Sequence, residues 1–215
     1  MGPIKVGNPT EQTGTKKPCF YTAFYSLGVN NLILLNMYDV ELKYIRDLHN
    51  ADSNVISQSP QISKDTRRYL GIVIMLNGQK YCIPFSSGQK DKYQSKKSNI
   101  DLIKIPDVEK KNNNGAYVTM AVLNLNNMIP VDESLITKVD LRMLKTDDYA
   151  QQRRKRLLQK ELAWCRENAE LIVRRAQKVY NIVTETPEKS HMLIKRCCNF
   201  KKLEDAMRRY LTKHK

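Results

Sequence analysis

Histidine and tryptophan are scarce in this 215-residue chain, which has three histidines and one tryptophan. The histidines, His49, His191 and His214, are widely separated, and none stands at a spacing typical of zinc ligands. The sequence also has no CxxC pair. A zinc site is therefore not supported, and we expect the protein to use no metal ion and no cofactor.

The five cysteines do not form a recognisable disulfide framework. Their number is odd, and two of them are adjacent, so that they can hardly bridge each other without strain: Cys19, Cys82, Cys165, Cys197 and Cys198. This usage fits a reduced compartment, with some cysteines packed as small apolar residues. We therefore expect a cytoplasmic protein.

The sequence has no apolar run long enough to cross a bilayer. Residues 1–17 are polar and are expected to be disordered. Residues 18–37 are moderately apolar, but a proline opens them, Asn30-Asn31 interrupts them and no small-residue cleavage site follows, so a signal peptide is disfavoured. A mis-assigned start, with Met37 as the true first residue, is an equal alternative. We predict a leader over 1–36 and one domain over 37–215.

Acidic residues are few relative to basic ones, with 22 Asp and Glu against 37 Lys and Arg. The net charge is +15, and residues 151–215 contribute 18 basic and 7 acidic side chains, a net of +11. A charged face often serves only to keep a protein in solution. The concentration of charge in the C-terminal third nevertheless favours a polyanionic partner such as a nucleic acid.

The clearest local signal is a β-hairpin. Residues 69–76 are rich in β-branched side chains, and residues 79–85 form the returning strand. Asn77-Gly78 between them is typical of a type I′ turn, in which both central residues need positive φ. Pro84 has no N–H to donate, so we predict that its strand lies at an edge or ends there.

Further β structure is predicted over 38–48, 117–125, 128–131 and 136–141, the first of these turning into a short helix. The polar stretches 50–66, 86–99 and 107–115 are predicted to be loops. Together these segments make a β core over about 37–145.

The rest of the chain, about 147–213, is predicted to be helical. Asp147 and Asp148 favour a helix start near Tyr149. A seam of apolar residues spaced three and four apart follows, and Pro187 ends the pattern. Asn199 is predicted to cap a last helix. Because the seam contains cysteine and small residues, packing on the same domain is favoured over a coiled coil. Basic residues fall largely off this seam, facing solvent or RNA: Arg153, Arg156, Lys160, Arg174 and Lys178.

The loop after the hairpin carries the groups best suited to chemistry on a phosphate. It contains Ser86, Ser87, Gly88, Gln89, Lys90 and Lys92. RNA cleavage by its own 2′-hydroxyl needs that hydroxyl held in line, its proton removed and the phosphorane charge stabilised. Hydroxyl and ammonium groups can meet all three of these requirements. An ordinary solvated basic loop has the same composition and is the commoner case for an isolated Ser-Ser-Gly.

Four stretches in order resemble the ToxN/AbiQ family of endoribonuclease toxins from type III toxin–antitoxin systems. They are KYIRDL at 43–48, GIVIMLNGQKYCIPFSS at 71–87, VLNLNNMIPV at 122–131 and CNFKKLE at 198–204. The resemblance covers residues 37 to 210. It implies an α+β fold, a compact SH3-like antiparallel β-barrel core decorated with helices, the long basic ones at the C-terminus.

The resemblance also implies which residues are catalytic. The family's strand ending in proline and its Ser/Thr–Ser loop fall on Ser86, Ser87 and Lys90, and its tyrosines fall on Tyr44 and Tyr149. The family pattern commonly reads Ser-Pro-Lys, whereas here Gly88 and Gln89 separate Ser87 from the lysine. The catalytic lysine is therefore either Lys90, which we prefer, or Lys92, with Gln89 in the expected place.

By this resemblance the protein would cleave single-stranded RNA at A-rich sites without a metal ion and leave a 2′,3′-cyclic phosphate. It would process its own repeat-derived antitoxin RNA, a pseudoknot-like unit, and stay bound to it in a closed assembly of two or three copies of each. Cellular or phage mRNA would be the substrate, and abortive infection the outcome. RNA contacts would come from Gln89, Lys92 and the basic helices.

Two other functions fit parts of the sequence. A non-catalytic RNA- or DNA-binding protein would have the same charge and would bind with a steep salt dependence but would cut nothing. A structural helix-pairing protein would dimerise through the seam over 158–183, although its cysteine and alanines make a weak zipper. Of the features described, only the hairpin and its loop favour a ribonuclease over a non-catalytic binding protein.

Overall fold

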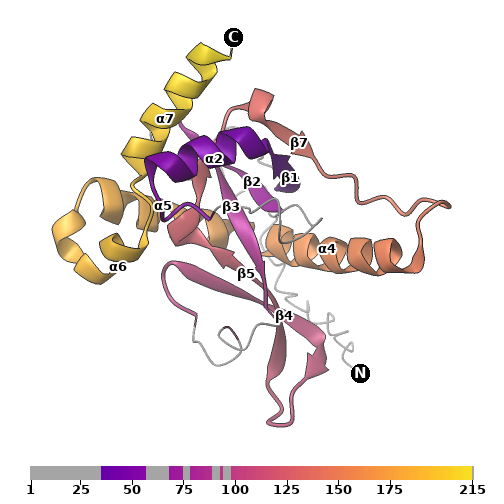
Figure 1. Ribbon diagram of the computed structural model, residues 1–215. Helices are drawn as coiled ribbons and strands as arrows, with labels where there is room; N and C mark the ends of the chain where they lie inside the picture. The colour runs from indigo at the N-terminus through magenta and orange to yellow at the C-terminus, as the bar shows by residue number, and fades with distance from the viewer. Residues whose placement is uncertain (1–34, 57–67, 75–77, 89–92, 94–97, 215) are drawn as a thin grey trace, which may run out of the picture. The chain divides into compact units, whose positions relative to one another are not determined.

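A single antiparallel sheet of seven strands organises the computed structural model, which describes residues 35–56, 68–74, 78–88, 93 and 98–214. All of these residues belong to one compact unit, Leu34–Lys215. The strands are β1 (Asn36–Val40), β2 (Tyr69–Ile74), β3 (Lys80–Ser87), β4 (Leu102–Lys111), β5 (Tyr117–Asn124), β6 (Ile129–Pro130) and β7 (Ile136–Lys138). With the helices that follow, the fold is α+β, as predicted (Figure 1).

The sheet does not close, so the expected SH3-like barrel is wrong. Its order is β4-β5-β3-β2-β1-β7, with β6 paired to β3 off this path. Among the described strands, β4 and β7 stand at the two ends and do not pair with each other. Closure would require a hydrogen-bonded seam between these strands, and β7 has only three residues. Alternating apolar residues specify a buried face but not whether a sheet closes.

The predicted hairpin is confirmed by β2 and β3, which pair antiparallel around Gly78, whose φ is +77°. The expected edge position of Pro84 is wrong, because β3 lies between β2 and β5. Pro84 faces Tyr69 of β2. On the opposite side β3 changes partner, from β6 at Cys82 to β5 at Phe85. Pro84 lies in the gap between these partners, where no strand needs its missing N–H.

Strand β4 was missed, and its second half was predicted to be a loop. The structure places residues 107–111 in β4, paired with β5 as far as Lys111 opposite Tyr117. The side chains from Val108 to Lys111 are exposed. A charged, solvated strand end of this kind has the composition of a loop, and only its partner in β5 makes it a strand.

The first helix, α2 (Leu42–Ala51), follows β1, and its strand-then-helix order is as predicted. It packs on the last helix, α7 (Phe200–Lys213). Asn199 caps α7, because its side-chain oxygen accepts a hydrogen bond from the backbone N–H of Lys202 at 3.1 Å. Figure 1 shows these two helices, far apart in sequence, lying together.

The predicted long helix is two helices, α4 (Tyr149–Glu167) and α5 (Ala169–Thr184), separated at Asn168. Asp148 and Gln151 form a capping box at the start of α4, where the acidic residues predicted a helix start. Seven of the eight residues of the apolar seam are buried against the chain's own strands and helices, which confirms same-domain packing: Leu158, Leu162, Cys165, Ala169, Ile172, Ala176 and Val179. The last residue, Val183, is half-buried.

The short helix α6 (His191–Arg196) lies in the part predicted to be helical, but it was not predicted as a separate helix. The cysteines within the described residues are free and buried, as expected of small apolar residues: Cys82, Cys165, Cys197 and Cys198. Within the described part of the chain, no helix has the length and apolar character needed to cross a bilayer.

Candidate active site and nucleic-acid interface

Ser86 and Ser87 are the last two residues of β3 rather than part of a loop. Ser86 lies opposite Val122 of β5, and Ser87 lies opposite Ala121. Successive side chains of a strand point to opposite faces of a sheet. The two side chains therefore project to opposite faces of the sheet.

The two serines also differ in environment. Ser86 is half-buried, and its hydroxyl oxygen accepts a hydrogen bond from the Nδ2 of Asn124 at 3.0 Å. Asn124, at the end of β5, is 5% exposed. Ser87 is exposed. Asn124 thus orients Ser86, which is half-buried, and Ser87 is the exposed member of the pair.

Gly88 follows directly and is fixed by its neighbours. Its backbone N–H donates to the Met120 carbonyl at 3.0 Å. A Cβ at this position would lie 2.4 Å from the backbone oxygen of Thr119. Proline here would lose the hydrogen bond and collide with β5. The backbone contact with β5 therefore favours glycine at this position.

The lysines of the predicted site, Lys90 and Lys92, lie outside the described residues, as does Gln89. The next described residue, Tyr93, is buried in a cluster with Leu102 and Val122. Because Val122 is opposite Ser86, Tyr93 packs on the Ser86 face of the sheet.

Lys104 is a basic residue near this site that the sequence analysis missed. It lies opposite Val122, so Lys104 and Ser86 share one face across β4, β5 and β3. It is half-buried between the buried residues Ile103 and Ile105. A lone lysine within an apolar strand was the available signal, but β4 itself had not been predicted.

Tyr44 does not occupy a position from which it could contact RNA. It is 0% exposed, and its hydroxyl donates to the Pro130 carbonyl at 2.7 Å. Its ring packs against that of Tyr210 with the centroids 5.2 Å apart. Burial raises its pKa well above the ordinary value, so the hydroxyl stays protonated. In this structure Tyr44 packs α2 against α7, and its catalytic role stays a prediction.

Tyr149 is 79% exposed as the first residue of α4. In Figure 1 this start lies at the outer end of the helix. Tyr44, Tyr149 and Ser86 therefore belong to three separate parts of the fold: the packing of α2 on α7, the start of α4 and the end of β3. An exposed tyrosine at a helix start is suited to stacking on a base.

The basic residues predicted to bind RNA are exposed on α4 and α5: Arg153, Arg156, Lys160, Arg174 and Lys178. Lys160 forms an ion pair with Glu109 of β4, which raises the pKa of the lysine and offsets part of its charge. Lys155, which lies between Arg153 and Arg156 in the sequence, instead donates to the Asp147 carboxylate at 2.8 Å and to the Arg142 carbonyl at 2.9 Å. It therefore fastens α4 to the segment that precedes it.

The CNFKKLE stretch contributes a buried polar network. Tyr81 and Tyr180 each donate to the Oε1 of Glu204 at 2.9 Å. Lys201 donates to the Tyr180 hydroxyl at 2.7 Å and forms an ion pair with Glu204. Both tyrosine pKa values are raised, chiefly by burial. This network joins β3, α5 and α7, so the stretch serves the fold.

Comparison with known proteins gives a consistent result. The sequence matches the family described as toxin ToxN of type III toxin–antitoxin systems over residues 36–208. Endoribonuclease ToxN of Pectobacterium atrosepticum is 26% identical over 174 residues, 81% of this chain and 92% of the relative. Endoribonuclease AbiQ of Lactococcus lactis subsp. lactis is 28% identical, over 79% of this chain and 86% of the relative.

Solved structures show the same similarity. AbiQ, described as a lactococcal anti-phage endoribonuclease of a type III toxin–antitoxin system, superposes with a TM-score of 0.67 at 27% identity, covering 83% of this chain and 98% of that one. A second structure, from a type III system whose toxin is selectively inhibited by a non-coding RNA pseudoknot, gives a TM-score of 0.65 at 27% identity. It covers 82% of this chain and 97% of that one.

Proposed function

We propose that this chain, which belongs to the ToxN family of type III toxin–antitoxin systems and is an endoribonuclease toxin, cleaves single-stranded RNA without a metal ion and leaves a 2′,3′-cyclic phosphate. One observation carries the assignment of the site. Ser87 is an exposed residue at the end of a strand whose next residue, Gly88, lies close against β5, so the backbone that carries Ser87 is held in place.

The chemistry requires no group beyond those of the chain and the RNA. The 2′-oxygen bonds to the adjacent phosphorus, the bond from phosphorus to the 5′-oxygen breaks, and the proton lost from the 2′-hydroxyl is balanced by one gained at the 5′-oxygen. We assign to Ser87 the task of holding the phosphate in line. Lys90, with Lys92 as its alternative, would neutralise the phosphorane charge.

The roles of the other predicted residues change accordingly. Ser86, oriented by Asn124, positions the strand end rather than contacting the phosphate. Tyr44 is assigned to packing, and Tyr149 to binding of RNA by stacking. The exposed basic side chains of α4 and α5 would bind the RNA backbone.

We propose further that the partner is an antitoxin RNA, which the protein processes from a repeated precursor and then holds in a closed assembly of two or three copies of each. Support comes from the net charge of +11 over residues 151–215 and from the relative inhibited by an RNA pseudoknot. The protein would cleave cellular or phage mRNA at A-rich sites in the cytoplasm. This cleavage would serve in anti-phage defence, as described for AbiQ.

The deciding experiment is cleavage of an A-rich single-stranded RNA by purified protein in EDTA, with the product ends identified by mass spectrometry. Ser87→Ala should lose at least about 100-fold in rate. Ser86→Ala, its neighbour on the opposite face, should lose far less. If Ser86→Ala is the damaging change, the site lies on the face that carries Asn124 and Lys104. RNA binding without cleavage by the wild type would instead support the non-catalytic nucleic-acid-binding alternative.

A further inference from the structure

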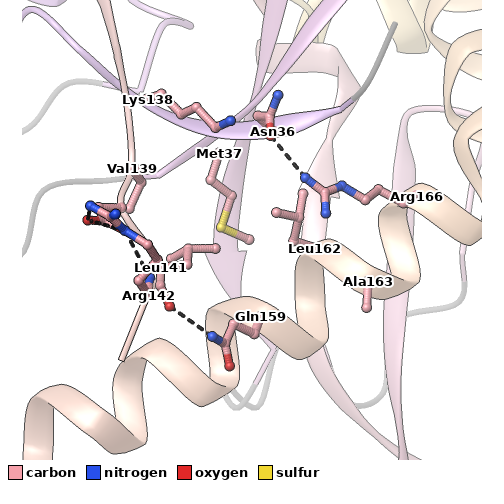
Figure 2. A pocket seen from close by; sticks show the side chains of 11 residues that line it. Asn36, Met37, Lys138, Val139, Leu141, Arg142, Gln159, Leu162, Ala163 and Arg166 are labelled. Carbon is pink, nitrogen blue, oxygen red and sulfur yellow. Dashed lines mark hydrogen bonds and ion pairs between the residues drawn. The ribbon is translucent and has the colours of Figure 1, made fainter. Parts of the chain in front are cut away.

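A groove of about 590 Å³ lies away from the serines, between the segment that follows β7 and one face of α4. Its walls are the end of β7 with residues 139–142, and the side chains of Gln159, Leu162, Ala163 and Arg166 (Figure 2). This volume falls in the range of small-molecule sites, roughly 300–1,000 Å³.

The floor of the groove is apolar. Met37 of β1, which is 1% exposed, turns its thioether toward the centre, and Leu141 and Leu162 converge on it from the two walls (Figure 2). The accessible apolar lining above Met37 comes from Leu141 and Ala163, which a flat aromatic ring could contact.

The rim of the groove is positive. Asp140 and Arg142 form an ion pair at 2.7 Å and offset each other. Lys138 and Arg166 also line the groove, and within the described residues neither forms an ion pair with a carboxylate. Arg166 donates from Nε to the Leu35 carbonyl and from Nη2 to Asn36 Oδ1, both at 2.9 Å. Those two bonds fix its guanidinium in place while using two of its five donors.

An apolar floor under a positive rim suits an aromatic base that carries a phosphate. We propose that this groove binds a single unpaired nucleotide of RNA, with its base against Leu141 and Ala163, close to Met37, and its phosphate at Lys138 and Arg166. The inference rests on the proposed function only in taking RNA as the partner. Arg156, exposed one turn before Gln159 on α4, would continue the phosphate path.

The leader is a less suitable occupant. Residues 1–33 contain three lysines and one acidic residue, Glu11, so they carry the same sign of charge as the rim. A nucleotide offers the opposite sign and a planar ring, which this lining can receive.

The test uses the full chain labelled with ¹³C-methyl methionine and titrated with AMP or with ribose 5-phosphate. The Met37 resonance is assigned from a Met37→Leu spectrum, and Met192, 72% exposed on α6, is the internal control. AMP should shift the Met37 methyl in a saturable way and leave Met192 unchanged. Ribose 5-phosphate, which lacks the base, should bind at least about tenfold more weakly, since it loses the apolar contact.

Matched variants localise the effect. Ala163→Trp fills the groove and should abolish the response of Met37 to AMP, whereas Ala150→Trp, on an exposed turn of the same helix, should not. Lys138→Gln should weaken binding of both probes by about two- to fivefold. Lys195→Gln, exposed on α6, should change neither.

Two results would overturn the proposal. An equal response to ribose 5-phosphate would mean that the rim binds phosphate alone. Absence of any Met37 response to AMP, including the case in which the leader or a second copy fills the groove, would exclude a nucleotide site. AMP has no internucleotide bond to cut, so either result is independent of whether the chain cleaves RNA.

Discussion

Asn124 and Ser86 are joined across two strands by a hydrogen bond of 3.0 Å from the amide nitrogen to the hydroxyl oxygen. Asn124 is almost fully buried, so its amide cannot easily turn to water when the serine is removed. The bond therefore fixes the end of β3, next to its last residue, Ser87. Both partners of the bond can be tested by substitution.

Asn124→Ala should lower the free energy of unfolding by about 1–3 kcal/mol, because it removes a buried donor and leaves a small cavity. Combined with Ser86→Ala in a double-mutant cycle followed by urea denaturation, the pair should show a coupling of at least about 0.5 kcal/mol. Strictly additive effects of the two substitutions would contradict an energetic role for this bond.

Gly88→Ala should destabilise the fold by about 1–3 kcal/mol, because the new methyl group would meet the Thr119 carbonyl, which is backbone and cannot swing away. Gly115→Asn is the matched control, since Gly115 has a φ of +75° but open space around its Cα, and asparagine tolerates that conformation. Thermal unfolding of both variants gives the comparison. A Gly88→Ala protein as stable as the control would show that the strand end can move away from β5.

The local structure that the sequence predicted correctly depends on neighbouring residues. Asn77-Gly78 marks the hairpin, Asp148 begins α4 and Asn199 begins α7, and each of these signals involves contacts within a few residues. The structure agrees because tertiary packing did not have to override them.

The predictions that were wrong depended on partners distant in sequence. Pro84 lies in an interior strand because β6 pairs with the residues before it and β5 with the residues after it, along the same edge of β3. No local sequence pattern reveals this change of partner. Residues 107–111 form a strand because β5 pairs with them. The sheet stays open because β4 and β7 do not meet in the described chain.

The candidate site was predictable in part. The two serines and Gly88 lie together at the end of β3, but their alternation across the sheet follows only once β3 is known to extend to Ser87. Tyr44 lies on a predicted element, and burial could not be assigned to it until α7 was known to pack over α2.

Tyr44→Phe separates packing from catalysis at that position. The substitution keeps the ring against Tyr210 and removes only the hydroxyl that donates to the Pro130 carbonyl. We expect a loss of about 1–2 kcal/mol in unfolding free energy, from the unsatisfied carbonyl, and an RNA cleavage rate within about twofold of wild type. Cleavage is measured under conditions where both proteins are fully folded. A fall of about 100-fold or more would restore Tyr44 to the catalytic residues.

Glu161 gives the protein a pH-dependent stability. It is 5% exposed on α4, and burial raises its pKa to about 8. In the unfolded chain a glutamate titrates near its ordinary value of about 4.3, so between these values the folded state holds a proton that the unfolded state releases. The free energy of unfolding should therefore fall as the pH rises from about 5 to about 8, by up to a few kcal/mol, and level off above that range.

Urea denaturation of wild type and Glu161→Gln across this pH range measures the effect. Glutamine has nearly the same shape and cannot ionise, so the variant should lose most of the decline and be the more stable protein at the alkaline end. Glu167→Gln, on the exposed side of the same helix, controls for removing a negative charge from α4 and should follow the wild-type curve. Parallel curves for wild type and Glu161→Gln would mean that the buried carboxylate ionises at little cost, through a compensating cation that approaches it.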